Sequence, residues 1–308
     1  MEKIYDIAVI GSGPAGLTAA VYGRRAGKSV VLFEKETFGG QMNLTGEIQN
    51  YPGIRSVSGA ELSSFMTDQA MDLGADAEFG EVVSVEKSGG IFTIKTDGED
   101  FFSRTVIAAA GVVPRRLGLE GEEKLIGAGI SFCAMCDGAF YAGKDVAVIG
   151  GGNTAVEDAV FLSDICRKVY LIHRRPSFRA EKLLVEKTEK KPNIEFVLDS
   201  VVKTLVTGAD GKLTAAKVEK TSGDGQKSDL LIQVSGIFEA VGRIPSNGIF
   251  RSLAECDGEG YIVAGENCIT SCEGFFAAGD CRTKDVRQIA TAVSDGACAA
   301  TAACRYLS

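Results

Sequence analysis

IYDIAVIGSGPAGLTAAVYGRRAGKSVVLFE, residues 4–34, decides the fold of this chain. The apolar run at 4–10 predicts a strand buried inside a parallel sheet. The turn GSGPAG at 11–16 follows at once, and the alanine-rich segment 15–26 predicts a helix. A second apolar strand at 30–33 ends in a glutamate. This order of strand, glycine turn, helix, strand and acid predicts a dinucleotide-binding unit.

The glycines of this first turn have separate physical roles. Gly11 permits the tight turn, Gly13 lets the backbone approach a pyrophosphate, and Gly16 lets helix and strand pack closely. The helix N-terminus offers free N–H groups to the phosphates. Glu34, 18 residues after Gly16, can accept hydrogen bonds from a ribose 2′-hydroxyl. A glycine turn without a ligand is the alternative, and the flanking strand and helix argue against it.

A second unit repeats this plan, with a strand at 146–149, the turn GGGNTA at 150–155, a helix at 156–163 and a strand at 168–172. The basic residues His173, Arg174, Arg175 and Arg179 stand where the first unit has its acid. Arginine binds phosphate through bidentate, charge-assisted hydrogen bonds. The second unit therefore predicts an NADP site, and the first predicts a dinucleotide with a free ribose, such as FAD. A solvated basic face is the alternative for the arginines.

The two units also continue alike, each with a hairpin-like segment and then an apolar strand that ends in glycine. The hairpins are expected at 82–96 and 212–234, and the closing strands at 106–111 and 236–242. An internal structural repeat is the simplest account. Residues 244–308 are too few for a third ordinary domain and are expected to complete the first.

We therefore expect the α/β class, with two Rossmann-like (three-layer ββα) dinucleotide-binding domains, one inserted in the other. The expected FAD-binding domain is discontinuous and comprises 1–113 and 244–308. The expected NADPH-binding domain comprises 114–243.

Length and composition exclude several classes of protein. The chain has 308 residues, and its 33 Lys+Arg against 41 Asp+Glu give a formal charge of −8. That balance argues against a nucleic-acid binder and against docking on an anionic membrane. Glu2 and Asp6 interrupt any signal-peptide core, and no apolar run reaches the roughly 18 residues of a membrane span. We expect a cytoplasmic protein whose nine cysteines are mostly reduced.

The sequence CAMCD at 133–137 carries the third chemical signal. Cys133 and Cys136 can form a small reversible disulfide, and Asp137 can move a proton to or from the leaving thiolate. Zinc is the competing interpretation, but four-ligand zinc needs a second pair, and the chain has no other C-x-x-C. We expect redox chemistry and no metal. The other seven cysteines are expected to be small buried hydrophobes.

Two nucleotides and a dithiol together define an electron path. A hydride would pass from NADPH to a flavin, and two electrons would then pass to the disulfide. The reduced pair could reduce an external disulfide through a mixed-disulfide intermediate.

The motifs in order resemble the low-molecular-weight NADPH-dependent thioredoxin reductases, and the resemblance covers essentially the whole chain. The matching stretches are GSGPAGLTAA at 11–20, GGQ at 39–41, NYPG at 50–53, CAMCDG at 133–138, GGGNTAVED at 150–158, HRRPSFRAEK at 173–182, AAGD at 277–280 and RQI at 287–289. The combination of CxxCDG, GGGNTA and HRRxxxR is specific.

The resemblance implies roles for individual residues. Cys136 would face the flavin, Cys133 would attack thioredoxin, and Asp137 would be the acid–base group. Asp280 would bind the ribityl chain of FAD. The expected FAD contacts are Gly11, Ser12, Gly13, Pro14, Ala15, Gly16, Glu34, Lys35, Gly40, Gln41, Asn50, Val83, Gly111, Gly279, Asp280, Arg287, Gln288 and Ile289. The expected NADPH contacts are Gly152, Asn153, Thr154, His173, Arg174, Arg175 and Arg179.

The resemblance also implies a homodimer and a large rotation between the domains. The nicotinamide and the disulfide belong to one domain, and both need access to the flavin, so two conformations are expected. The hinges would lie at the chain crossings, near 112–114 and 242–244.

Two positions depart from the family pattern. Ala110 stands where the family usually has threonine, which removes a possible hydrogen bond near the flavin. Glu239 stands where the family usually has a small or apolar residue. A carboxylate there could alter the behaviour of the hinge or the cofactor.

Several rival functions compete with this one. The larger disulfide reductases use a C-terminal histidine, and this chain has none after His173. A ferredoxin-dependent flavin reductase would typically lack the arginine clamp. A reductase for another disulfide, a dithiol oxidase, a non-enzymatic flavin redox sensor and a plain NADP-binding protein with a structural CxxC remain alternatives.

Overall fold

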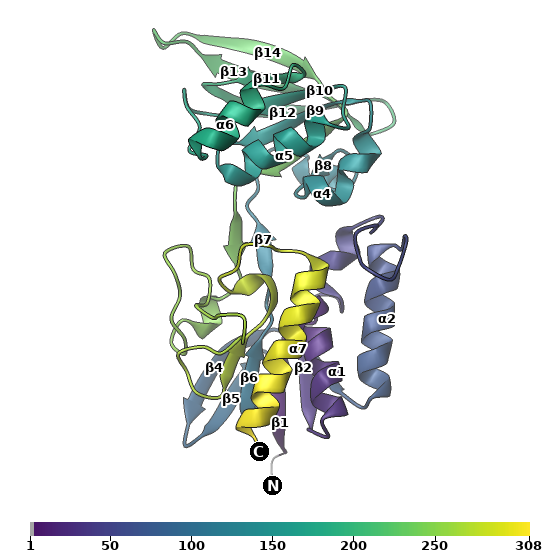
Figure 1. The fold of residues 1–308 in the computed structure, drawn as a ribbon, viewed down its shortest axis with the longest axis vertical. Coiled ribbons are helices and arrows are strands. Elements are labelled where there is room, and N and C mark those ends of the chain that lie inside the picture. Colours follow the sequence, from purple (N-terminus) through teal and green to yellow (C-terminus); the bar gives the residue numbers. More distant parts are fainter. Residues whose placement is uncertain (1–2) are drawn as a thin grey trace. The chain divides into compact units, whose positions relative to one another are not determined.

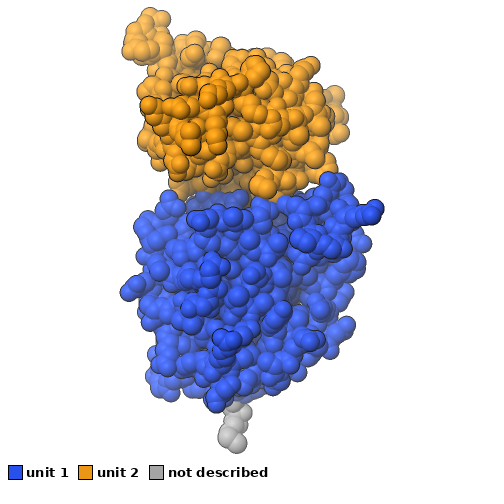
Figure 2. Space-filling view, viewed as in Figure 1, with its two compact units in different colours: residues 1–113, 243–308 blue, residues 114–242 orange. Residues whose placement is uncertain are grey.

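The computed structural model describes residues 3–308. The chain forms two compact units, one from 1–113 and 243–308 and the other from 114–242 (Figure 2). The predicted boundary at 243 differs by one residue, because Arg243 begins a strand of the first unit. The two Rossmann-like units, one inserted in the other, confirm the predicted α/β class.

The first unit is built on a seven-stranded sheet with the order β3-β2-β1-β6-β5-β4, and β17 pairs with β6 (Figure 1). Its central pairings are parallel, and β4, β5 and β6 are joined as antiparallel neighbours. The strands predicted at 4–10 and 30–33 and the hairpin predicted at 82–96 are confirmed, whereas the strand expected at 106–111 begins at Asp100 and ends at Ala108. The strands are β1 (Ile4–Ile10), β2 (Val30–Glu34), β3 (Asp76–Phe79), β4 (Val82–Ser88), β5 (Ile91–Thr96), β6 (Asp100–Ala108) and β17 (Phe275–Ala277).

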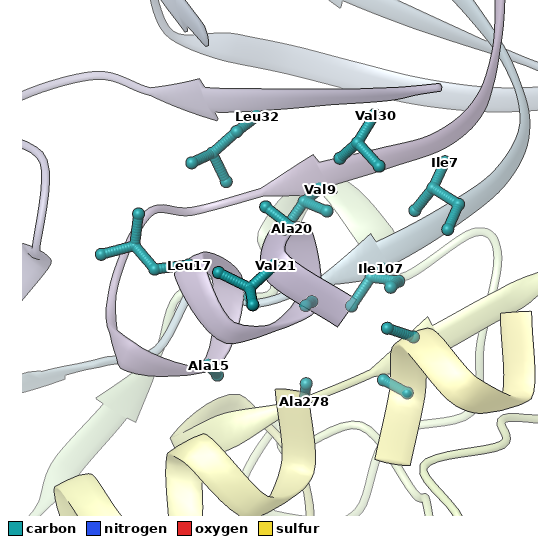
Figure 3. Packing of buried hydrophobic residues seen from close by; sticks show 14 of the residues in the cluster. Ile7, Val9, Ala15, Leu17, Ala20, Val21, Val30, Leu32, Ile107 and Ala278 are labelled. Carbon is teal, nitrogen blue, oxygen red and sulfur yellow. The ribbon is translucent and has the colours of Figure 1, made fainter. Parts of the chain in front are cut away.

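Alternate side chains of the sheet enter two cores. Ile7 and Val9 of β1 pack under α1 (Pro14–Arg25) and α7 (Ile289–Tyr306) (Figure 3). Ala8 and Ile10 face the opposite core. Small residues let the two helices approach closely: a Cβ added at Gly296 would lie 2.2 Å from the Ala15 carbonyl oxygen. The unit also contains α2 (Gly59–Asp72) and the 3₁₀ turns η1 (Gly40–Leu44), η3 (Gly248–Phe250) and η4 (Gly279–Cys281).

The second unit has a five-stranded parallel sheet, β11-β10-β9-β15-β8, and an antiparallel sheet, β12-β13-β14. One core lies between the two sheets, and another lies beneath α5 (Asn153–Ser163). The strands are β8 (Ile130–Ser131), β9 (Asp145–Gly150), β10 (Lys168–Ile172), β11 (Ile194–Val197), β12 (Ser200–Thr207), β13 (Leu213–Thr221), β14 (Lys227–Gln233) and β15 (Gly236–Ala240). The other elements are α3 (Glu122–Leu125), α4 (Ala134–Asp137), η2 (Gly138–Tyr141) and α6 (Lys182–Glu189).

The chain crosses between the units twice, and the two crossings are paired with each other. β7 (Val112–Pro114) and β16 (Arg243–Pro245) form a two-stranded sheet. The Arg115 amide donates to the Gly242 carbonyl at 2.9 Å on the side of the second unit. Over residues 3–308, we find no helix with the length and apolar character needed to span a membrane.

Candidate functional site

The first glycine turn is closely packed on its inner side and open on its outer side. Gly11 has φ +103°, and an added Cβ would lie 2.4 Å from the Ala109 carbonyl oxygen. A Cβ at Gly16 would lie 1.8 Å from the Gly11 oxygen, so neither position tolerates a side chain. Gly13, which precedes α1, faces open space, and no side chain caps the helix there. The backbone N–H groups at this helix end are therefore placed to meet an anion.

Glu34 holds this turn together. Its carboxylate accepts the Ser12 hydroxyl at 2.5 Å and the Ser12 amide at 3.2 Å. It also accepts the backbone amides of Lys35 and Glu36, each at 2.9 Å. Glu34 is buried, and these contacts give it a structural role in shaping the turn. Its predicted contact with a ribose stays a prediction.

The structure brings a second glycine segment against the turn. A Cβ added at Gly40 would lie 3.3 Å from the Gly13 Cα, so GGQ and GSGPAG are neighbours in space. Gln41 is exposed beside them. Val83 is half exposed on β4, and Gly111 lies just after β6 with φ +64°. The predicted contacts of Val83 and Gly111 with FAD stay predictions.

Asp280 lies far from the glycine turn in sequence but at the same edge of the first unit's sheet. Both β1 and β17 run parallel to β6, with Ile10 and Ala277 each opposite Ala108. The residues that come directly after β1 and β17 therefore emerge at one edge of the sheet. Gly279 has φ +78°, and an added Cβ would lie 2.9 Å from the Ala15 Cβ, so this turn also needs glycine.

Asp280 has a free hydrogen-bonding atom. Its Oδ1 is buried and has no hydrogen-bond partner among residues 3–308. Burial raises the pKa of this carboxyl group, while the positive charges of Arg243, Lys284 and Arg287 lower it. A buried acceptor without a partner is costly, and a ligand hydroxyl would satisfy it. The open glycine turn and this acceptor together fit a ligand that carries both phosphates and hydroxyl groups.

The start of α7 joins further predicted residues. The Asn50 side-chain amide donates to Gln288 Oε1 at 3.1 Å, although 238 positions separate them. The Arg287 guanidinium lies 4.2 Å from the Tyr261 ring centre and donates to the Asp280 carbonyl at 3.4 Å. The predicted residues from 50, 280 and 287–288 are thus linked by direct contacts.

The second glycine turn has the same open character. Gly152 precedes α5, faces open space and has no side-chain cap. Gly151 lies against the His173 ring, since an added Cβ would be 2.2 Å from it. The Arg179 amide donates to the Gly151 carbonyl at 2.7 Å, which holds the basic segment beside the turn.

His173 is buried beneath the exposed arginines Arg174, Arg175 and Arg179. Its ring stacks on Phe178, and its Nε2 has no hydrogen-bond partner in the described part of the chain. Burial lowers the pKa of His173, and the three arginine charges lower it further. His173 is therefore neutral at pH 7, and the positive charge facing solvent comes from the arginines.

Asn153 has a partner that the sequence did not indicate. Its Nδ2 donates to the Glu181 carboxylate at 3.2 Å, and the Glu181 amide donates to its Oδ1 at 2.9 Å. This pair ties the first turn of α5 to the segment before α6. Thr154 is exposed in the same turn of α5.

The predicted redox pair is present as a disulfide between Cys133 and Cys136. The Cys133 Sγ accepts the Cys136 amide at 3.2 Å. Asp137 accepts the Ser131 hydroxyl at 2.6 Å, and the same hydroxyl accepts the Cys133 amide at 3.1 Å. Burial raises the pKa of Asp137, and the Ser131 hydrogen bond opposes that effect. The disulfide segment and a carboxyl group that holds a proton more strongly than usual are therefore joined through the Ser131 hydroxyl.

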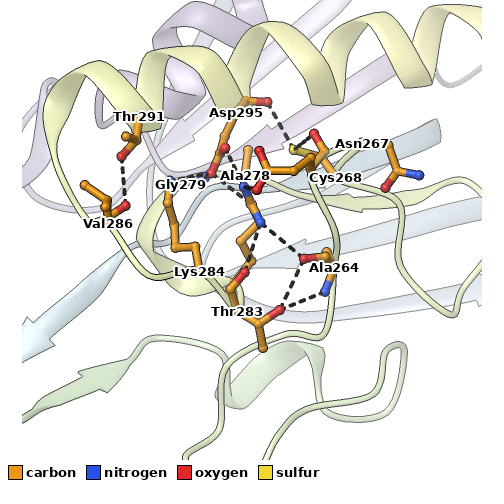
Figure 4. Close-up of polar contacts among 12 residues, drawn as sticks. Ala264, Asn267, Cys268, Ala278, Gly279, Thr283, Lys284, Val286, Thr291 and Asp295 are labelled. Atoms are coloured by element: carbon orange, nitrogen blue, oxygen red, sulfur yellow. Dashed lines mark hydrogen bonds and ion pairs between the residues drawn. The ribbon is translucent and has the colours of Figure 1, made fainter.

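Sequence reasoning missed Ser131, because a serine two residues before a cysteine belongs to no recognised motif. It also missed an ionic cluster behind Gly279, formed by Arg282, Lys284 and Asp295 (Figure 4). The sequence holds one signal for this cluster, since Asp295 is the one acidic residue in α7.

Known proteins resemble this chain over its whole length. Residues 5–296 match the family model for pyridine nucleotide-disulphide oxidoreductases. A thioredoxin reductase of Peptoclostridium acidaminophilum is 41% identical, covering 100% of this chain and 98% of that protein. One from Listeria monocytogenes is 40% identical, covering 99% and 95%. The thioredoxin reductase structure from Streptococcus pyogenes has a TM-score of 0.91 and 40% identity, covering 100% and 99%. This chain belongs to the pyridine nucleotide-disulphide oxidoreductase family.

Proposed function

We propose that this protein is a thioredoxin-disulfide reductase that passes electrons from NADPH through FAD and the Cys133–Cys136 disulfide to oxidised thioredoxin. The observation that carries the proposal is the disulfide itself, linked to Asp137 through Ser131 within a nucleotide-binding fold. The full-length relatives named thioredoxin reductase support this choice of partner.

The FAD site is proposed at the carboxyl edge of the first sheet. The Gly11–Gly16 turn and the start of α1 would hold the pyrophosphate, and Asp280 Oδ1 would accept a ribityl hydroxyl. FAD, when bound, supplies reversible two-electron chemistry between a nicotinamide and a disulfide. The domain that holds it would comprise 1–113 and the C-terminal segment.

The NADPH site is proposed in the inserted unit. The Gly150–Ala155 turn would hold the pyrophosphate at the start of α5, and Arg174, Arg175 and Arg179 would bind the 2′-phosphate. Because His173 is buried and its pKa is lowered, the arginines would supply the selectivity for NADPH over NADH.

The dithiol would complete the reaction with balanced electrons and protons. Two electrons, which FAD would deliver, and two protons would reduce the Cys133–Cys136 disulfide to two thiols, and the Cys133 thiol would then lose its proton to become the attacking thiolate. The Cys133 thiolate attacks one sulfur of the partner disulfide and forms a mixed disulfide, and Cys136 then displaces the partner as a dithiol. The amide that donates to Cys133 Sγ would stabilise the attacking thiolate. Asp137 would give or take the proton at a cysteine sulfur.

Two exposed apolar side chains lie close to the disulfide along the chain and support a protein partner. Met135 lies between the two cysteines and is 59% exposed, and Phe140 lies shortly after them at 47%. Exposed apolar side chains of this size mark protein interaction sites when they are grouped. We propose that thioredoxin contacts them. A homodimer and a cytoplasmic location are further parts of the proposal.

Anaerobic stopped-flow absorbance tests the proposal directly. The yellow protein is mixed with NADPH or with NADH, and then with oxidised thioredoxin. We expect faster bleaching of the flavin with NADPH and its reoxidation by thioredoxin. Bleaching without reoxidation would show that thioredoxin is not the partner, and would favour a reductase for another disulfide or a dithiol oxidase. No bleaching by either nucleotide would favour a ferredoxin-dependent reductase, and a colourless protein would exclude a flavin enzyme.

A further inference from the structure

A buried ionic cluster lies directly behind the Gly279–Asp280 turn (Figure 4). Asp295 of α7 is 4% exposed and accepts the Gly279 amide at 2.9 Å. It also accepts Arg282 through two guanidinium nitrogens, at 2.9 and 2.7 Å, and Lys284 Nζ at 2.8 Å. One carboxylate thus holds a backbone amide and two cations.

Stability alone is a poor explanation for this cluster. Arg282 is 2% exposed and the Lys284 side chain is 6% exposed, so three charged groups are removed from water. Burying such groups carries a large desolvation cost for each ion, and well-packed apolar residues often stabilise a fold equally well. What the ions add is directional contact: Arg282 also donates to the carbonyls of Ala264 and Thr283, at 3.2 and 2.9 Å.

The contacts of the cluster converge on Asp280. The residue before it, Gly279, is fixed by Asp295. The Asp280 carbonyl accepts a hydrogen bond from the Arg287 side chain. Arg287 lies just before α7, the helix that carries Asp295. The Gly279 amide is therefore bonded to α7, and the Asp280 carbonyl is bonded to the segment that leads into α7. The Asp280 Oδ1 atom is buried and has no hydrogen-bond partner among residues 3–308.

We propose that Asp295 is a positioning residue for the flavin nucleotide. By holding the Gly279 amide and the Arg282 side chain, it fixes the turn in the conformation that leaves Asp280 Oδ1 available to a hydroxyl of the ligand. Asp295 itself contacts no cofactor. The inference rests on the proposed FAD site.

The test measures binding to the apoprotein of the full chain, with FAD and ADP as separate probes. ADP lacks the ribityl chain and would use only the glycine turn of α1. We expect Asp295→Ala to weaken FAD binding at least tenfold in a fluorescence titration and to change ADP binding less than twofold. Equal losses for both probes, or FAD binding within twofold of the wild-type value, would overturn the proposal.

Asp295→Glu gives a second variant that keeps the charge balance if alanine prevents folding. Its carboxylate is displaced by one methylene, so we expect FAD binding to weaken several-fold while far-UV circular dichroism is unchanged. Unchanged FAD affinity in this folded variant would also overturn the proposal.

Asp6→Asn is the matched control in the same unit. Asp6 accepts a backbone amide from Ser29 at 2.9 Å and lies 3.4 Å from Arg104, but it stands near the start of β1. We expect it to lower thermal stability without changing FAD affinity. A wild-type apoprotein that binds no FAD would overturn both the proposed function and this inference. A wild-type protein that binds FAD, with Asp295 variants that bind equally well, would overturn the inference alone.

Discussion

At the scale of single residues, Glu239 is the least expected side chain in the molecule. It lies on β15, buried, and neither carboxylate oxygen has a hydrogen-bond partner among the described residues. Burial and the negative charge of the neighbouring Glu122 raise its pKa to about 8, and Arg116 opposes this. The carboxyl group is therefore mostly protonated at neutral pH, which makes its place in an apolar strand tolerable.

This protonation makes stability depend on pH. The folded state keeps the Glu239 proton up to about pH 8, while the unfolded chain loses it near 4.5, so stability falls as pH rises between these values. Glu239→Gln should remove that fall and stabilise the protein at pH 8 by roughly 2–4 kcal/mol. Urea unfolding at pH 5 and pH 8 measures the difference. Parallel pH profiles for the variant and the wild type would contradict the assignment.

Asp137 should govern the pH dependence of disulfide reduction. Its pKa is raised by burial, so it holds a proton to higher pH than an ordinary aspartate and can donate it to a thiolate. Asp137→Asn should lower the rate about 100-fold and remove the decline at rising pH, in single-turnover kinetics. Ser131→Ala removes the hydrogen bond that lowers this pKa, so it should shift the decline to higher pH. An unshifted decline would show that another group titrates.

At the scale of elements, the two glycine turns differ in the residues that come after the second strand of each unit. β2 ends in Glu34, whose carboxylate accepts hydrogen bonds from the backbone of the turn and of Lys35. After β10 it places a buried histidine and exposed arginines. The same strand-turn-helix frame therefore presents an acidic, internally bonded end in one unit and a basic, solvent-facing end in the other.

The arginines after β10 should discriminate between the two nicotinamide nucleotides. Arg174→Ala with Arg175→Ala should raise KM for NADPH by at least about 100-fold and leave KM for NADH nearly unchanged, since each lost charged hydrogen bond is worth about 1.5–3 kcal/mol. Steady-state kinetics with both nucleotides measures this. Lys190→Ala, a lysine just after α6, is a control for general loss of positive charge. Equal effects on KM for both nucleotides would contradict the assignment of these arginines to a 2′-phosphate site.

The elements themselves were predictable from sequence, and most of their contacts were not. β1, α1 and β2 result from a local alternation of apolar runs and glycines, which the backbone geometry enforces. The Asn153–Glu181 pair and the Asp295 cluster depend on where tertiary packing brings distant segments, and no local pattern encodes that. Glu34 is the instructive case: its position was predicted, while its four protein donors came only from the fold.

At the scale of the whole molecule, the two units have separate hydrophobic cores. Each buried cluster draws its residues from one unit alone. Each unit is therefore expected to respond to its own ligand, because a ligand stabilises the structure that contains its site.

Hydrogen exchange should separate the two responses. FAD added to the apoprotein at about 100 times its Kd should slow exchange in β1, α1 and α7 by an amount equivalent to about 2.7 kcal/mol. NADP⁺ should protect β9, β10 and α5 instead. Mass spectrometry of peptides from both units measures this. Protection of all elements by either ligand would show that the units open together.

The discontinuous first unit has a consequence for synthesis. Chains emerge from the ribosome amino-terminus first, and domains generally fold as units during synthesis. The inserted unit is continuous over 114–242, so its two cores can be completed before the rest of the chain has been made. The first unit must wait for β17 and α7. The turn with Asp280 and the helix that positions it are therefore made after the whole inserted domain, and a nascent chain would acquire that domain before it could retain a flavin.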